Sequence, residues 1–200
     1  MTEDRTIGNI MRADVLRCGP KTPLSEAAQM MQENRCGSIL VMDGERPVGI
    51  WTEHDALSLD LESGTALDVP VGKVMSSPLV TSGPNVTVSE AGRRMKDEGL
   101  RHLVVTGPQG KLLGIVSQTD VIKHFGIQHY MYLRDVRSAV PRALVTVKAE
   151  VPYTEAMKAM RDERSDAAVV VDAEGKPLGI VTERDILRLI SKRDIIRPVY

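Results

Sequence analysis

Three pairs of hydroxyl and carboxylate side chains recur along this 200-residue chain, and each pair could hold part of a nucleotide. A hydroxyl residue that ends a strand and opens a helix leaves backbone N–H groups and the positive end of the helix dipole facing outward, which suits a phosphate. The aspartate one turn later can accept hydrogen bonds from two adjacent hydroxyls. Each pair therefore matches a ribose phosphate. We call each pair of hydroxyl residue and aspartate a hydroxyl–aspartate turn. The first, second and third turns are Thr52 with Asp55, Ser117 with Asp120, and Thr182 with Asp185.

The same spacing has a second interpretation that needs no ligand. A Ser or Thr followed three residues later by an acid is typical of a capping box, in which the two side chains satisfy backbone donors at the start of a helix. From the residues alone, both interpretations stay open. His54 and Arg184, which lie inside the first and third turns, could point at a ligand or at solvent.

The residue types needed for catalysis or for a metal site are not arranged to work together. The histidines show no metal-ligand spacing, and no serine stands in a Gly-x-Ser-x-Gly turn. The two cysteines form no Cys-x-x-Cys pair, so we expect small buried residues rather than a zinc site or a disulfide. We therefore expect no enzyme activity, no catalytic cofactor and no metal. The residues considered are His54, His102, His124, His129, Cys18 and Cys36.

Composition argues against nucleic acid and membrane partners. The formal charge of -1 comes from 26 basic and 27 acidic residues that are interspersed, and one Phe and one Trp cannot form a base-stacking platform. The longest apolar stretches run to about five residues, far below the roughly 20 that span a bilayer. The polar, acidic N-terminus does not resemble a secretory signal. We expect a cytoplasmic protein.

Each turn occupies the same place in a repeated unit, because successive turn aspartates are 65 residues apart. Apolar residues at helical spacing with an acidic first turn are followed by two β-rich runs around a Gly- or Asp-containing turn, which indicates a hairpin. The predicted order is strand, helix, strand, strand, helix, an α+β fold. The units cover residues 7–60, 71–125 and 133–192, and residues 193–200 start a linker to an expected fourth copy.

Units of about 60 residues bury little surface alone, so two of them should share a core. The glycines three residues before each turn, Gly49, Gly114 and Gly179, then permit close approach of a base or of a neighbouring unit.

Four short stretches of the second unit carry a family resemblance: VMSSPLVT (74–81), SEAGRRM (89–95), RHLVV (101–105) and GIVSQTD (114–120). Together they resemble the CBS motif, and the chain resembles a tandem CBS protein in three copies. The resemblance implies that the first two copies pair as a Bateman module. The third copy departs at its start, where residues 135–139 replace the Ile-Met or Val-Met entrance of the others.

The resemblance also implies a ligand, namely AMP, ADP, ATP or another adenosyl compound. In nucleotide-binding relatives, basic residues before the second strand meet phosphate, which makes Arg101 and His102 phosphate candidates. Val80 and Val116 could line an adenine or belong to the core. The second turn, with Ser117, therefore ranks first, followed by the first and then the third turn.

The leading hypothesis is a regulatory module that binds an adenine nucleotide in the cleft between paired motifs and signals to an output domain outside this chain. The amino-acid sequence of the second repeat and of the linker that follows it resembles the N-terminal sensory region of a bacterial signalling protein. The alternative is a ligand-free structural or dimerisation module. Because the third unit has no mate, we expect a homodimer in which it pairs with the third unit of a second chain.

Overall fold

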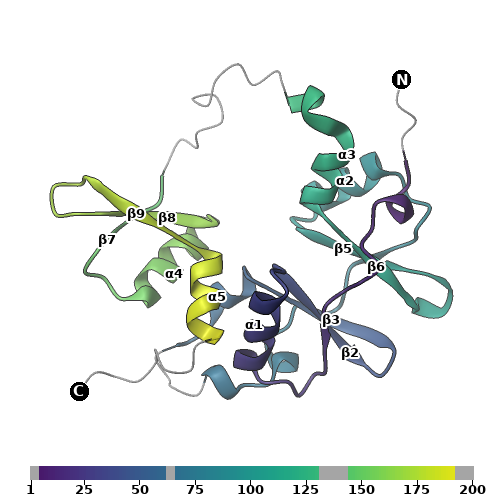
Figure 1. Ribbon diagram of the computed structural model, residues 1–200, viewed down its shortest axis with the longest axis horizontal. Helices are drawn as coiled ribbons and strands as arrows, with labels where there is room; N and C mark the ends of the chain where they lie inside the picture. Colours follow the sequence, from purple (N-terminus) through teal and green to yellow (C-terminus); the bar gives the residue numbers. More distant parts are fainter. Residues whose placement is uncertain (1–4, 62–65, 131–143, 192–200) are drawn as a thin grey trace. The chain divides into compact units, whose positions relative to one another are not determined.

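The computed structural model describes residues 5–61, 66–130 and 144–191, and each of the three repeats forms one three-stranded sheet with helices (Figure 1). The first strand of each sheet is parallel to the second in all three repeats. The second and third strands form the predicted antiparallel hairpin in the second and third repeats. The expected α+β repeat is confirmed.

The elements follow the order expected from the sequence. Repeat 1 contains β1 (Arg17–Cys18), α1 (Leu24–Glu33), β2 (Ser38–Asp43), β3 (Arg46–Thr52) and the 3-10 turn η2 (Asp55–Ser58). Repeat 2 contains β4 (Thr81–Ser82), α2 (Val88–Asp97), β5 (His102–Thr106), β6 (Leu112–Ser117) and α3 (Gln118–Tyr130). Repeat 3 contains β7 (Thr146–Lys148), α4 (Tyr153–Asp162), β8 (Ala167–Val171), β9 (Pro177–Thr182) and α5 (Glu183–Ser191). Short 3-10 turns lie at η1 (Ile7–Asn9), η3 (Ala66–Asp68), η4 (Val71–Lys73) and η5 (Pro108–Gly110).

The second helix of repeat 1 is shorter than its counterparts in the other two repeats. Only the four residues of η2 are helical there, whereas the equivalent α3 and α5 run for 13 and 9 residues.

The described residues divide into two compact units. Unit 1 contains residues 5–15, 43–48 and 78–130, and unit 2 contains residues 16–42, 49–61, 66–77 and 144–191. Unit 1 is therefore mainly repeat 2, and unit 2 combines most of repeat 1 with repeat 3.

The segments that precede β1 and β4 are exchanged between repeats 1 and 2. The first opening segment, residues 5–12, lies in unit 1, where Arg12 and Ile115 of β6 exchange two backbone hydrogen bonds of 2.9 and 3.0 Å. The second opening segment, residues 69–76, lies in unit 2, where Ser76 and Ile50 of β3 exchange two of 2.8 and 3.1 Å. Each of the two repeats thus supplies a segment to the other, as expected of a pair.

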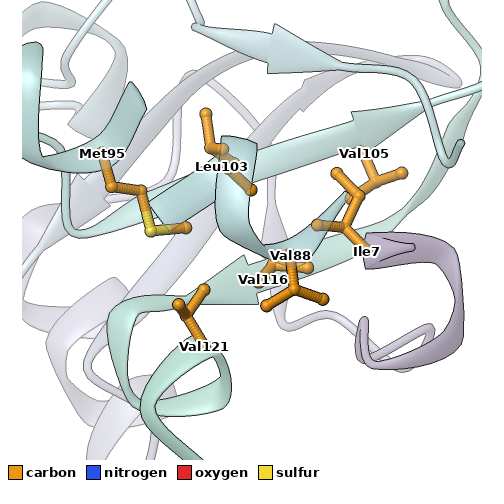
Figure 2. Close-up of a cluster of buried hydrophobic side chains, with 8 residues drawn as sticks. Ile7, Val88, Met95, Leu103, Val105, Val116 and Val121 are labelled. Atoms are coloured by element: carbon orange, nitrogen blue, oxygen red, sulfur yellow. The ribbon is translucent and has the colours of Figure 1, made fainter. Parts of the chain in front are cut away.

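Apolar side chains from the first opening segment complete the core of unit 1. Ile7 packs with side chains from α2, β5, β6 and α3 (Figure 2). Val116 belongs to this cluster and is fully buried, while Val80 packs at its margin. Val116 is therefore a core residue rather than the wall of a ligand site.

In unit 2 the helices of repeat 3 pack against repeat 1 of the same chain. Helices α1 and α5 lie side by side (Figure 1), and η2 contacts both α4 and α5. Ser191 at the end of α5 donates a hydrogen bond of 2.8 Å to the Gln32 side chain. The helices of repeat 3 thus contact the helical side of repeat 1 within the same chain.

Within the described ranges, no helix combines the length and the apolar character needed to cross a bilayer.

Candidate functional site

The second hydroxyl–aspartate turn joins the end of β6 to the start of α3. The Ser117 backbone N–H and hydroxyl donate hydrogen bonds of 2.9 and 2.6 Å to Oδ2 of Asp120, and the Asp120 N–H donates one of 3.2 Å to the Ser117 Oγ. This reciprocal arrangement is a capping box. The ligand-free interpretation of the spacing therefore describes the helix start correctly.

The two bonds to the carboxylate recur in the other two turns. In the first turn, Thr52 donates from its N–H and its hydroxyl to Oδ2 of Asp55, at 2.8 and 2.7 Å. In the third, Thr182 donates to Oδ2 of Asp185 at 3.0 and 2.7 Å. In all three turns one carboxylate oxygen caps the helix, which leaves the other oxygen, Oδ1, for a different partner.

The partner of Oδ1 differs from turn to turn. Asp120 accepts a hydrogen bond of 3.2 Å from the Arg12 guanidinium, and Asp55 accepts one of 3.0 Å from the Ser76 hydroxyl. Both partners come from docked opening segments and hold equivalent positions, after Met11 and Met75. In the third turn, Arg188 of the same helix donates at 3.3 Å to Asp185. Helix capping therefore uses Oδ2 alone and leaves Oδ1 to other partners.

The surroundings of Asp120 hold its carboxyl group in the ionised form. Burial raises the pKa of this group, but hydrogen bonds from the Ser117 hydroxyl and N–H and the charge and hydrogen bond of Arg12 outweigh burial and lower the pKa below its ordinary value. Because the folded pKa is depressed, the stabilisation by ionised Asp120 is present above the unfolded pKa of about 3.9 and is lost as pH falls through the folded pKa.

We expect Ser117→Ala and Arg12→Gln each to raise the pKa of Asp120, with the larger rise for Ser117→Ala because it removes the stronger contact. Carboxyl-carbon NMR of Asp120 over an acid titration measures this directly. Unchanged titration curves in both variants would contradict the described hydrogen bonds.

Arg101 and His102 lie beside the second turn, as predicted. His102 is directly opposite Ser117 in the pairing of β5 with β6, and the Arg101 carbonyl accepts a hydrogen bond of 3.0 Å from the Gln118 N–H. Both side chains are half-buried. Together with Arg12, which contacts Asp120, they give unit 1 three basic residues at or beside the second turn, although sequence reasoning identified only two of them.

His54 and Arg184 contact carboxylates of the opposite repeat within unit 2. The His54 ring nitrogen Nδ1 lies 2.6 Å from the buried Glu183 carboxylate, and Arg184 donates to Glu53 at 3.3 Å. His54 of the first turn thus pairs with Glu183 of the third turn, and Glu53 of the first turn pairs with Arg184 of the third. These side chains join repeats 1 and 3, so neither of the two interpretations given for them was complete.

Two glycines before the turns are required by the opening segments. A Cβ atom on Gly114 would lie 2.5 Å from the Arg12 carbonyl oxygen, and one on Gly49 would lie 2.2 Å from the Met75 sulfur. The predicted close approach is therefore to a neighbouring repeat at these two positions.

Neither cysteine forms a disulfide, and both are half-buried rather than fully buried as expected. Burial, assisted by the charge of Glu26, raises the pKa of the Cys18 thiol to about 11. Among the described residues, no group of three or more His, Cys, Asp or Glu side chains could hold a metal ion.

Comparison with known proteins places these sites in a family context. The chain is 32% identical over 120 residues to the uncharacterized protein MK0525 of Methanopyrus kandleri, matching 59% of this chain and 61% of the relative. It is 29% identical to the uncharacterized protein MJ1404 of Methanocaldococcus jannaschii, matching 93% of this chain and 44% of the relative. The chain thus spans about half the length of these relatives.

Solved structures share the fold. Protein MJ1225 of M. jannaschii superposes with a TM-score of 0.76 at 18% identity, covering 92% of this chain and 72% of that one. CBSX2 in complex with AMP gives a TM-score of 0.56 at 23% identity, covering 63% of this chain and 98% of that one. The CBS domain pair of protein MJ0100, in complex with 5′-methylthioadenosine and S-adenosyl-L-methionine, gives a TM-score of 0.56 at 16% identity. The match covers 63% of this chain and 99% of that one.

The CBS domain model matches residues 7–62, 71–126 and 134–197, close to the three units expected from the sequence. These matches cover most of the chain and coincide with its three sheets. The protein therefore belongs to the CBS domain family and carries three copies of the domain.

Proposed function

We propose that the protein is a regulatory module that binds an adenosyl ligand, first of all at the second hydroxyl–aspartate turn. The observation that carries this proposal is that the two carboxylate oxygens of Asp120 have different partners. Its Oδ2 caps helix α3, while its Oδ1 is held by an arginine with an exposed side chain, which a ligand can displace. The fold relatives CBSX2 and the MJ0100 pair, which bind AMP and S-adenosyl-L-methionine, support an adenosyl ligand.

The charges around the second turn favour a ligand with a phosphate. In our proposal the ribose hydroxyls donate to Oδ1 of Asp120, and the released Arg12 meets the phosphate together with Arg101 and His102. A guanidinium binds a phosphate strongly because it offers several parallel donors. The first turn offers the neutral Ser76 at the place of Arg12, so it fits a less charged adenosyl group or a lower affinity.

Regulation follows from the position of Arg12. This residue lies in the opening segment that repeat 1 supplies to repeat 2, so a ligand that moves Arg12 also changes how firmly the segment is held. The resulting shift cannot exceed the difference in ligand affinity between the two states. We propose that the shift is passed to an output domain outside this chain, in a cytoplasmic protein that forms homodimers.

Calorimetric titration with AMP, ATP, S-adenosylmethionine and 5′-methylthioadenosine tests the proposal. We expect saturable heat with at least one of them and a rise in the unfolding temperature, because a ligand that binds only the folded state stabilises it. Absence of heat and of any thermal shift with all four would leave the alternative, a ligand-free structural module. That alternative is favoured by the capping boxes of the first and second turns, which are complete without a ligand.

We expect Arg12→Gln to change ligand selectivity rather than abolish binding. AMP should bind about tenfold more weakly or worse, since a hydrogen bond to a charged group is lost. 5′-Methylthioadenosine, which has no phosphate, should bind as tightly as to the unmodified protein or more tightly, because Arg12 no longer competes for Asp120. Equal losses for both ligands would show that Arg12 does not recognise phosphate.

A further inference from the structure

Two methionines of the opening segments lie directly against glycines of the sheets that receive them. A Cβ atom built on Gly114 would lie 3.1 Å from both Cγ and Sδ of Met11. The three atoms nearest to a Cβ built on Gly49 all belong to the Met75 side chain. A thioether therefore contacts the backbone at each of these two positions, with no room for a further atom between the side chain and the glycine.

Both methionines are within reach of solvent. Met11 and Met75 are half-buried. Four methionines of the helices, in contrast, are at most 2% exposed: Met31, Met95, Met157 and Met160. The thioether of methionine is a common target of oxidants. An oxidant dissolved in water therefore reaches the methionines of the opening segments before it reaches those of the core.

Each of the two methionines is followed by a residue that holds its segment in place. Arg12 exchanges two backbone hydrogen bonds with Ile115, and Ser76 exchanges two with Ile50. The side chains of Arg12 and Ser76 also contact Oδ1 of the aspartate in the second and the first turn, respectively. Met11 packs in addition against the core of unit 1. A change at either sulfur therefore acts on a backbone contact and on a turn aspartate together.

We propose that Met11 and Met75 form a redox-sensitive switch, in which a peroxide oxidises their thioethers and the opening segments leave the sheets. The O–O bond of hydrogen peroxide breaks, one oxygen forms a bond to the methionine sulfur, and the other oxygen leaves with both protons as water. The sulfur loses two electrons and becomes a sulfoxide, while the peroxide is reduced. Methionine sulfoxide reductases reverse the change with electrons from a thiol.

The sulfoxide cannot keep the position of the thioether. Oxidation makes the side chain polar, and a polar group without a hydrogen-bond partner is costly to bury. An oxygen directed at the glycine meets backbone, and an oxygen directed at water draws the sulfur away from the glycine. We expect the larger effect at Met75, because its sulfur is the atom nearest to a Cβ built on Gly49, whereas the nearest atom at Gly114 is the Arg12 carbonyl oxygen.

Treatment of the 200-residue chain with hydrogen peroxide tests the switch, with peptide mapping by mass spectrometry and amide hydrogen exchange as the two measurements. We expect oxygen at Met11 and Met75 before any of the four buried methionines. The Ile50 and Ile115 amides, which donate to the opening segments, should then exchange about tenfold faster or more. A methionine sulfoxide reductase with its thiol reductant should restore their protection. The reductant alone should not, which separates methionine oxidation from cysteine oxidation.

Leucine variants assign the effect to the two sulfurs. The double variant Met11→Leu with Met75→Leu nearly conserves volume and should keep both amides protected after peroxide treatment. The double variant Met30→Leu with Met42→Leu is the matched control, because these methionines are also half-buried but lie outside the opening segments. It should lose protection as the unmodified chain does.

Three results would overturn the proposal. The first is oxidation of the buried methionines ahead of Met11 and Met75. The second is oxidation of Met11 and Met75 while both amides keep their protection. These two outcomes are measured on the unmodified chain, so they decide the matter even if a leucine variant does not fold. The third is protection by the control variant but not by the variant of the opening segments. No nucleotide is added, so the outcome is separate from that of the calorimetric titrations.

Discussion

The variant Gly114→Ala should lose about 1–3 kcal/mol of unfolding free energy, the usual range for an overpacked contact. The added methyl carbon would lie 2.5 Å from the Arg12 carbonyl oxygen and 3.1 Å from the Met11 side chain. A backbone atom cannot move aside as a flexible side-chain end can. The two hydrogen bonds between Arg12 and Ile115 must therefore stretch or break, and Ile7 must leave the core of unit 1 in part.

Chemical denaturation of the whole chain measures this loss, and Gly179→Ala is its matched control. Both variants make the same change three residues before a turn hydroxyl, but only Gly114 is covered by an opening segment. An equal unfolding midpoint for Gly114→Ala and the unmodified chain would mean that residues 5–12 are not docked on β6 in solution.

The variant Asp120→Asn should weaken AMP binding by about 10- to 100-fold, the equivalent of losing hydrogen bonds to a charged group. Asparagine keeps the size of the side chain but removes the negative charge that accepts hydrogen bonds from the ribose hydroxyls and holds Arg12 near the site. The capping box is also weakened, which costs helix α3 about 0.5–2 kcal/mol.

Asp185→Asn separates the two effects. It damages an equivalent capping box with the same bonds to Thr182, so its cost in stability should be similar, but it should leave the strongest AMP site intact. If both variants lose AMP binding equally, the loss reflects general destabilisation. If neither loses it, AMP binds away from the second turn.

The repeated elements could be predicted from the sequence because their signals are local. The spacing of the turns, the hairpins and the acidic first turns of α1, α2 and α4 all depend on residues a few positions apart. The capping boxes were foreseen for the same reason. Arg101 and His102 could be placed near Ser117 because they are its neighbours across a hairpin.

The residues that sequence reasoning missed all act across repeats. Arg12 and Asp120 are 108 positions apart, and His54 and Glu183 are 129 apart. No local pattern shows that an opening segment serves a different repeat from the one it precedes. Aligning the segments that end in Met11-Arg12 and Met75-Ser76 would have identified equivalent residues, but not that both reach the aspartate of the opposite repeat.

A crystal structure of the chain saturated with AMP is the most direct test of the central claim that Asp120 divides its two oxygens between helix and ligand. We predict the ribose hydroxyls within hydrogen-bond distance of Oδ1, the Ser117 bonds to Oδ2 unchanged, and Arg12 turned from Asp120 to the phosphate. AMP bound elsewhere, with the Arg12 to Asp120 ion pair intact, would contradict the account.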